Sequence, residues 1–183
     1  MNLTDDIWTQ ATLPISLGGI GITSAIELCT PAYLASIHSV SELIKNVLTD
    51  SSCSVLDHHV EAGMSIWQKK STKEIPEELF RSTQIFWSYP IQCQKHENLM
   101  QSFTHPQDKA RLLALTSKKS NFWLQALPCG SLGTLLDNDS LRISMALRLG
   151  AEVVKPHSCI CGALVSSDSL HGLNCQKSGG RRS

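Results

Sequence analysis

The chain has 183 residues, of which 42% are apolar and 17% charged, and its 16 basic and 16 acidic side chains give a formal net charge of zero. This apolar content excludes a disordered tail, and the zero net charge excludes a protein that coats nucleic acid by bulk electrostatics. The charged fraction lies below the ~25% typical of soluble domains, so we expect part of the surface to be covered by a partner or by further chain.

Capping residues predict short helices in the first fifty residues. Ser24-Ala25-Ile26-Glu27 has the spacing of a capping box, in which a serine and a glutamate three residues apart satisfy the first backbone N–H groups of a helix. Thr30-Pro31 resembles an N-cap followed by proline at the first helical position. Residues 31–38 are therefore a separate short helix or a kinked continuation of the first. Ser39-Val40-Ser41-Glu42 repeats the capping spacing and predicts a helix to about Leu48.

Apolar residues recur at helical spacing through the middle of the chain. They predict a helix over 53–70, and a second that begins at Pro76 and that Pro90 ends or kinks. Residues 99–103 mark one more helical face. Another helix is predicted from Pro106 to about residue 127.

The last predicted helix follows a loop over 130–138 and is capped by Asn138 or Asp139, with Gly150 at its end. Alternating strand patterns are absent before residue 150, so the predicted fold is mainly α, with strands limited to short hairpins near the last cysteines. We place a boundary near 151–156. It separates a helical linker bundle over 1–150 from a tail over 151–183 that is too short to bury its own core.

Three of the seven cysteines lie close together near the end of the chain. The other four are scattered singly and do not resemble a disulfide framework; they are Cys29, Cys53, Cys93 and Cys129. The first ten residues lack the basic region of a signal peptide, and the sequence lacks an apolar run long enough to span a membrane. We therefore expect a reducing compartment, cytoplasmic or nuclear, in which clustered cysteines bind metal.

Cys159, Cys161, His171 and Cys175 form a complete tetrahedral ligand set for Zn²⁺. Three thiolates and one imidazole leave no open position for water, which favours a structural site over a catalytic one. Gly162 suits the tight turn after the second cysteine.

Two alternatives to this ligand set stay open. The first pair is Cys-x-Cys instead of the commoner Cys-x-x-Cys, and His157 stands two residues before Cys159 as a rival ligand. The second alternative is that these residues form a cysteine-rich tail that binds no metal.

Other residues that could carry chemistry are better explained by structural positions. Gly18-Gly19-Ile20-Gly21 is interpreted as a helix entry turn, since it lacks the preceding strand and the lysine of a phosphate-binding loop. Asp5-Asp6 is interpreted as the start of a helix, and Asp57-His58-His59 with Glu61 as a solvated helix face. The four tryptophans are interpreted as core residues; they are Trp8, Trp67, Trp87 and Trp123. Arg142 and Arg148 are interpreted as solvated surface residues.

Basic residues surround the cysteine cluster, although the whole chain is neutral. Residues 151–183 carry four basic and two acidic side chains, a net charge of +2. A compact metal knuckle with this charge can contact a nucleic-acid backbone. The residues predicted to contact phosphate are Lys155, Lys177, Arg181 and Arg182.

Spaced motifs along nearly the whole chain resemble the region downstream of the reverse transcriptase domain in non-LTR retrotransposon polyproteins. The N-terminal motifs are Asp5-Asp6-Ile7-Trp8, Gln10-Ala11-x-Leu13-Pro14, Gly18-Gly19-Ile20-Gly21-Ile22, Ser24-Ala25 and Ala35-Ser36. The later ones are Trp123-Leu124-x-Ala126-Leu127-Pro128, Leu141-Arg142-Ile143, Ala146-Leu147-Arg148-Leu149-Gly150 and His171-Gly172-Leu173-x-Cys175.

The resemblance implies a helical linker followed by a Cys-Cys-His-Cys zinc knuckle, here at Cys159, Cys161, His171 and Cys175. In that family, the region helps to position template RNA or target DNA during target-primed reverse transcription, beside the rest of the polyprotein. The carboxylates of a polymerase or nuclease are missing from the sequence, so the resemblance implies a non-catalytic fragment. The alternative hypothesis is a zinc-stapled protein–protein interaction module without a nucleic-acid role.

Overall fold

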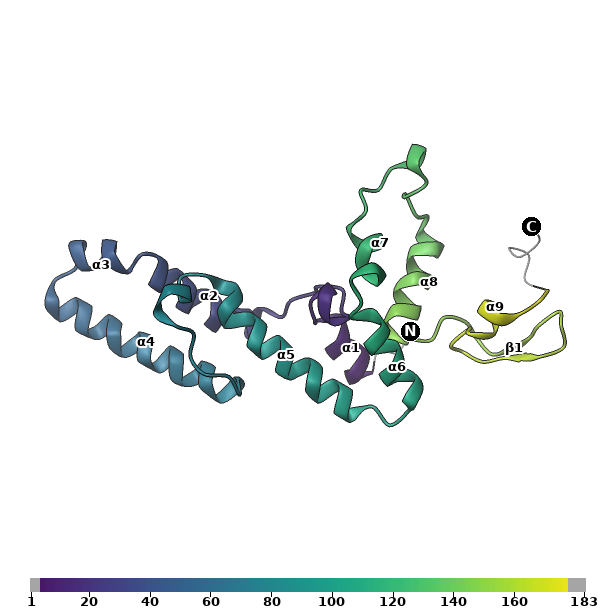
Figure 1. Ribbon diagram of the computed structural model, residues 1–183, viewed down its shortest axis with the longest axis horizontal. Helices are drawn as coiled ribbons and strands as arrows, with labels where there is room; N and C mark the ends of the chain where they lie inside the picture. Colours follow the sequence, from purple (N-terminus) through teal and green to yellow (C-terminus); the bar gives the residue numbers. More distant parts are fainter. Residues whose placement is uncertain (1–3, 178–183) are drawn as a thin grey trace. The chain divides into compact units, whose positions relative to one another are not determined.

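The computed structural model describes residues 4–177 and is mainly α-helical, as the sequence predicted, with a small hairpin near the last cysteines (Figure 1). The α-helices are α1 (Asp5–Ala11), α2 (Ala25–Ser39), α3 (Ser41–Val47), α4 (Asp50–Lys70), α5 (Gln84–Ser102), α6 (Pro106–Leu115), α7 (Phe122–Gln125), α8 (Asn138–Leu149) and α9 (His171–Asn174). The 3₁₀ turns are η1 (Ile15–Leu17), η2 (Glu78–Phe80), η3 (Lys118–Asn121) and η4 (Gly130–Leu132), and the strands are β1 (His157–Ser158) and β2 (Leu164–Val165).

The described chain divides into two compact units that interleave in sequence. Unit 1 contains residues 4–11, 15–20 and 103–177, and unit 2 contains residues 12–14 and 21–102. The predicted boundary near residue 150 stays a prediction. None of the helices within residues 4–177 combines the length and apolar character needed to cross a bilayer.

Two tryptophans occupy the core of unit 2. Trp67 of α4 and Trp87 of α5 are fully buried and meet edge to face, with ring centroids 5.3 Å apart. The Trp67 indole N–H donates to the backbone carbonyl of Trp87 at 2.6 Å, and the Trp87 indole donates to the Arg81 carbonyl at 2.7 Å. Both buried N–H groups therefore have acceptors, which burial of an indole requires.

Helices α2 and α4 approach each other closely at Gly63. A Cβ atom at this position would lie 3.1 Å from a methyl group of Leu34, a fully buried side chain of α2. Glycine at this point of α4 therefore allows the two helices to bury Leu34, Ala35 and Val60 together.

A buried arginine forms the centre of unit 1. Arg148 is only 4% exposed, in contrast to the solvated surface position expected from the sequence. Its Nε donates to the carbonyl of Gly19 at 3.0 Å, and its Nη2 donates to the carbonyl of Ile15 at 3.0 Å and to Oδ1 of Asn121 at 2.8 Å. Burial lowers the pKa of the guanidinium from its usual value. The expectation was wrong because two backbone carbonyls and the Asn121 amide oxygen replace part of the hydration of this charge, while Nη1 is buried without a hydrogen-bond partner.

A second layer of polar contacts surrounds the C-terminus of α8. Nε2 of Gln10 donates to the carbonyls of Gly18 and Arg148, both at 3.0 Å. Nη1 of Arg111 donates to the same Arg148 carbonyl at 2.7 Å and to Oε1 of Gln10 at 2.8 Å. Gly150 ends the helix with φ +69°, as predicted, and a Cβ atom there would clash with the Arg111 guanidinium at 2.5 Å. The left-handed conformation therefore favours glycine at position 150, and a side chain there would also displace the Arg111 guanidinium.

Two prolines lie inside helices, so of the predicted alternatives at each proline the one in which the helix continues is confirmed and the one in which a helix starts or ends there is wrong. Helix α2 runs continuously through Pro31, so residues 31–38 continue the first helix and Thr30 is not an N-cap. Helix α5 likewise continues through Pro90 and includes residues 99–102. In both helices the apolar face is buried around the proline, and this burial outweighs the lost backbone hydrogen bond.

Side-chain hydrogen bonds explain the other differences in helix ends. The helix expected from Pro76 starts only at Gln84, because Arg81 donates to the Pro76 carbonyl at 2.9 Å and keeps the intervening chain out of a regular helix. The helix expected to reach residue 127 ends at Leu115. Beyond this point, the hydroxyl groups of Thr116 and Ser120 donate hydrogen bonds to backbone carbonyls of the last helical turn.

The predicted N-caps were also misplaced or lacked the expected side-chain bond. Ser24 caps α2 without a side-chain hydrogen bond, and Val40 precedes α3 in place of Ser39. The N-cap of α8 is Asp137, which accepts from the Ser140 N–H at 2.9 Å.

We expect Arg148→Lys to destabilise the protein strongly, because a lysine ammonium cannot reach the acceptors on η1, Gly19 and Asn121 together. The expected loss in the free energy of unfolding is about 2–4 kcal/mol, measured by urea denaturation. Arg142→Lys is the control, since Arg142 is exposed and pairs with Asp139 at 3.6 Å. A loss for Arg148→Lys within about 0.5 kcal/mol of the control would contradict the role of the network.

Candidate metal centre

The β-hairpin places two cysteines in one turn. Strands β1 and β2 pair antiparallel, with His157 opposite Val165 and Ser158 opposite Leu164. The Cys159 N–H donates to the Ala163 carbonyl at 2.9 Å, and the Gly162 N–H donates to the Cys159 carbonyl at 2.8 Å. Gly162 adopts φ +91°, the left-handed region predicted for this tight turn.

A polar turn leads from the hairpin to α9 and orients the other two cluster residues. The N–H groups of Val153 and Val154 both donate to the Ser167 carbonyl, at 2.8 and 3.2 Å. The Asp168 carboxylate accepts the Leu170 N–H at 3.1 Å, which directs the chain into α9. His171 begins this helix, and its carbonyl accepts the Cys175 N–H at 2.8 Å. Sequence reasoning missed this turn, although its run of serines around one aspartate is typical of local side-chain hydrogen bonding.

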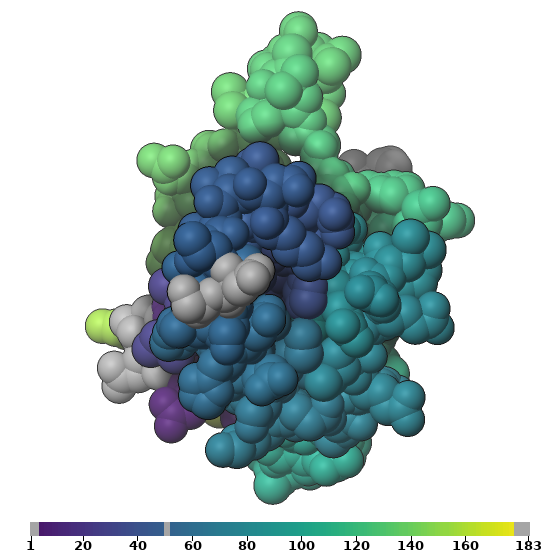
Figure 2. All heavy atoms as spheres, turned by 90° about the vertical axis from the view of Figure 1, so that its left-hand side faces the viewer, coloured from purple at the N-terminus to yellow at the C-terminus, as the bar shows by residue number. Residues whose placement is uncertain are grey.

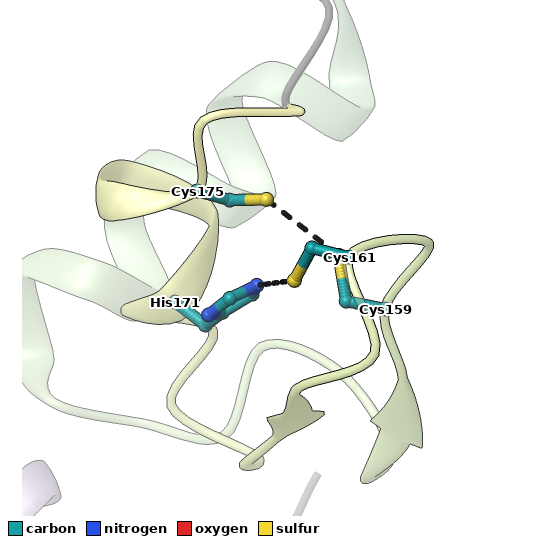
Figure 3. A group of neighbouring side chains, drawn as sticks. All are labelled: Cys159, Cys161, His171 and Cys175. Atoms are coloured by element: carbon teal, nitrogen blue, oxygen red, sulfur yellow. Dashed lines mark hydrogen bonds between the residues drawn. The ribbon is translucent and has the colours of Figure 1, made fainter.

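The four predicted ligands converge on one point, as Figure 3 shows. Their ligand atoms all lie within 4.8 Å of one another. The sulfurs of Cys159 and Cys175 are 3.7 Å apart, and Nε2 of His171 lies 3.2 Å from the sulfur of Cys161. A tetrahedron with Zn–S bonds of ~2.3 Å has edges of about 3.8 Å between sulfurs. The separation of the Cys159 and Cys175 sulfurs is close to this edge length, so these two side chains could bind one metal ion together.

The cluster lies at the surface and one of its members is buried. Cys175 is 5% exposed, Cys159 and His171 are half-buried, and Cys161 is exposed. An open hollow of about 280 Å³ borders the cluster, and His157 and Lys177 also line it. A metal ion can therefore reach the ligands from solvent without a rearrangement of the helices.

Local hydrogen bonds favour a thiolate at Cys159. The backbone N–H of Cys161, the His171 side chain and the Cys161 thiol lower the pKa of Cys159 to about 6. At Cys175, the backbone N–H of Lys177 lowers the pKa, but burial and the neighbouring Cys159 outweigh it and raise the pKa overall. The lowered pKa of Cys159 favours the thiolate form that a metal ligand requires, and metal ligation also requires deprotonation of the other thiols.

The remaining predicted residues of the tail have separate positions. His157 is exposed and its Nδ1 lies 2.9 Å from the Lys155 carbonyl oxygen, so the rival ligand is not part of the four-residue cluster. Lys155 and Lys177 are exposed, and Nζ of Lys177 contacts the Ile160 carbonyl at 3.5 Å. Arg181 and Arg182 lie outside the described residues.

Other candidate groups do not assemble into a second metal site. Among residues 4–177, the one group of three or more His, Cys, Asp or Glu residues with metal-ligand geometry is the Cys₃His cluster. Asp57-His58-His59 and Glu61 are exposed on α4, and Asp5-Asp6 begins α1. Trp67 and Trp87 are core residues as expected, Trp123 is half-buried, and Trp8 is exposed. All seven cysteines are free thiols.

Comparison with known proteins returned no match to a family model, a curated protein or a solved structure.

We expect the purified protein to bind one metal ion per chain, because the four ligand atoms complete a coordination sphere. Cys161→Ser should lose this metal, as measured by elemental analysis against protein concentration. Cys129→Ser is the matched control, since Cys129 is a free thiol outside the cluster and its variant should keep the metal. Equal metal content in both variants would contradict the site.

Proposed function

We propose that Cys159, Cys161, His171 and Cys175 bind a structural Zn²⁺. The observation that carries this proposal is the convergence of three sulfurs and one imidazole nitrogen within 4.8 Å. Zn²⁺ is the ion that combines thiolate and imidazole ligands in a closed tetrahedral site. When bound, it would cross-link the hairpin turn to α9 and the residue after it.

The size of the tail supports a structural role for the ion. Between residues 151 and 177, the buried apolar residues are Ala151, Val165 and Cys175, and each strand has two residues. A segment with so little buried apolar area requires another source of stability, and metal coordination supplies it.

We further propose that the chain is a non-catalytic segment of a non-LTR retrotransposon reverse transcriptase polyprotein, and that its tail binds nucleic acid. The ordered motifs along the sequence support this origin. The proposed non-catalytic role rests on the sequence, which lacks the carboxylate set by which a polymerase or nuclease holds its metal ions.

Phosphate contact would come from basic residues near the metal cluster. Lys155 and Lys177 are exposed on either side of the cluster in sequence, and Arg181 and Arg182 add positive charge in the segment that follows. With a net charge of +2, residues 151–183 would attract a polyanion although the whole chain is neutral. In the proposed setting the tail would help to position template RNA or target DNA for target-primed reverse transcription.

A second candidate function is a protein–protein interaction module whose zinc site only stabilises the tail. Exposed apolar side chains at α3 favour it, because Val40, which precedes the helix, and Leu43 and Val47 within it recur at helical spacing. Figure 2 shows the surface of α3 and α4, which face the viewer. This function would give binding to a protein partner and no affinity for oligonucleotides.

Removal of the metal should unfold the tail and leave the helical units folded. We expect chelation to abolish amide protection in residues 151–177, while protection in α4 and α5 persists, as hydrogen exchange with mass spectrometry can measure. Equal protection of the tail with and without metal would show that the ion has no structural role.

Nucleic-acid binding should depend on salt and on the two described lysines. Lys155→Gln with Lys177→Gln should weaken oligonucleotide binding and reduce the slope of log affinity against log salt concentration by about 1.4, which corresponds to two lost contacts with single-stranded phosphates. Fluorescence anisotropy with a labelled single-stranded oligonucleotide measures both quantities.

Lys69→Gln is the control for this measurement, because Lys69 is also exposed but lies on α4 in unit 2. Absence of oligonucleotide binding by the metal-loaded wild type would contradict the nucleic-acid function and favour the interaction module.

A further inference from the structure

A hollow of about 360 Å³ lies in unit 2, lined by the last turn of α2, by α3, by the first half of α4 and by η2. Its volume is within the range of ~300–1,000 Å³ that is typical of small-molecule pockets. Part of the lining is aliphatic and comes from Ile37, Ile44, Leu56 and Val60. These side chains suit a ligand with an apolar body.

The charged side chains around the hollow favour a cation. Glu42 and Lys45 of α3 form an ion pair at 3.4 Å and offset each other. Asp57 of α4 and Glu78 of η2 are exposed, and neither has an ion-pair partner among the described side chains. The lining therefore has a net charge of −2 when His38 is neutral, which attracts a positively charged ligand.

A histidine at the hollow has a nitrogen without a hydrogen-bond partner. The ring of His38 stacks on the buried Trp87, with ring centroids 5.9 Å apart, and its Nε2 is buried and unpartnered. Burial and the nearby Arg81 lower the pKa of His38, which favours the neutral ring. Buried polar atoms are nearly always hydrogen-bonded, so this nitrogen points to a donor that a ligand supplies.

The spacing of the charged groups favours an organic cation over a single metal ion. Among residues 4–177, the Cys₃His cluster is the one group of three or more His, Cys, Asp or Glu side chains close enough to hold a metal. The carboxylates, His38 and Cys53 of the hollow therefore do not converge on one point. A flexible chain with separated positive charges can instead reach Asp57 and Glu78, which lie on different elements.

We propose that this hollow binds an aliphatic polyamine, with ammonium groups at Asp57 and Glu78 and methylene groups against the aliphatic lining. An ammonium N–H would also supply the donor that His38 lacks. The inference is independent of the proposed nucleic-acid function, since it concerns unit 2 and uses none of the residues of the metal cluster or the tail.

The test is calorimetric titration of the metal-loaded full chain with spermidine at about 150 mM salt, where weak surface attraction is largely screened. We expect saturable binding of one spermidine per chain. Asp57→Asn with Glu78→Gln should weaken this binding about fivefold or more, because both ammonium contacts are lost.

Glu61→Gln is the matched control, because Glu61 is exposed on α4 but does not line the hollow. Its variant should bind spermidine within about twofold of wild type. Absence of spermidine binding by the wild type, or wild-type affinity in the double variant, would overturn the proposal.

Mg²⁺ in place of spermidine separates a shaped site from general attraction to negative charge. We expect no saturable binding of Mg²⁺ in unit 2, because the carboxylates of the hollow do not converge. If Mg²⁺ displaced spermidine at equal charge concentration, the hollow would act only as a diffuse negative surface and the proposal would be wrong.

A measurement on the wild type avoids dependence on variants. Cys53 is a half-buried free thiol that lines the hollow, whereas Cys29 is an exposed free thiol of α2 outside it. Saturating spermidine should slow the alkylation of Cys53 by iodoacetamide about twofold or more and leave Cys29 unchanged, as peptide mass spectrometry can measure. An unchanged rate at Cys53 would contradict occupation of the hollow.

Discussion

The organisation of unit 1 depends on one buried positive charge whose hydrogen-bond partners include no carboxylate. Arg148 donates to two backbone carbonyls and one side-chain amide, and its own carbonyl accepts from Gln10 and Arg111. Desolvation of a guanidinium is costly, and the three acceptors on Nε and Nη2 offset that cost. The turn over 15–20, η3 and the C-terminus of α8 are therefore fixed together by the geometry of one side chain.

The two ends of unit 1 illustrate two different ways to stabilise irregular backbone. Around Arg148, carbonyl groups of a turn receive donors from a long side chain within a packed interior. In the tail, the turn residues bond to one another, and the cysteine and histidine side chains converge in a cluster near solvent. Unit 2 uses the first of these on a smaller scale, since Arg81 donates to the Pro76 carbonyl before α5, while Trp67 and Trp87 pack against each other in its core.

Sequence reasoning succeeded where the relevant contacts are local. The four cluster residues lie within 17 positions of one another, and the turn at Gly162 is dictated by neighbours, so spacing alone predicted their convergence. The end of α8 was also predicted, because it depends on the glycine at position 150 directly after the helix. The bound metal and the origin of the chain stay predictions, since geometry alone does not identify either.

The failures involve contacts between distant residues. Arg148 meets Gly19 and Ile15 across 129 and 133 positions, so nothing in its own helix distinguishes it from the exposed Arg142. Pro31 and Pro90 stay inside helices because tertiary burial offsets a local penalty. The hollow beside His38 was missed for a related reason, since its lining side chains come from four separate elements.

The interleaving of the two units has a consequence for the order of events during synthesis. All of unit 2 is complete once residue 102 has left the ribosome, and it can fold while the rest is still being made. Gln10 contacts the Arg148 carbonyl 138 positions away, so its buried amide gains that partner only after residue 148 has been synthesised. During that interval the early helix α1 depends on solvent or a chaperone to satisfy groups that the finished protein buries.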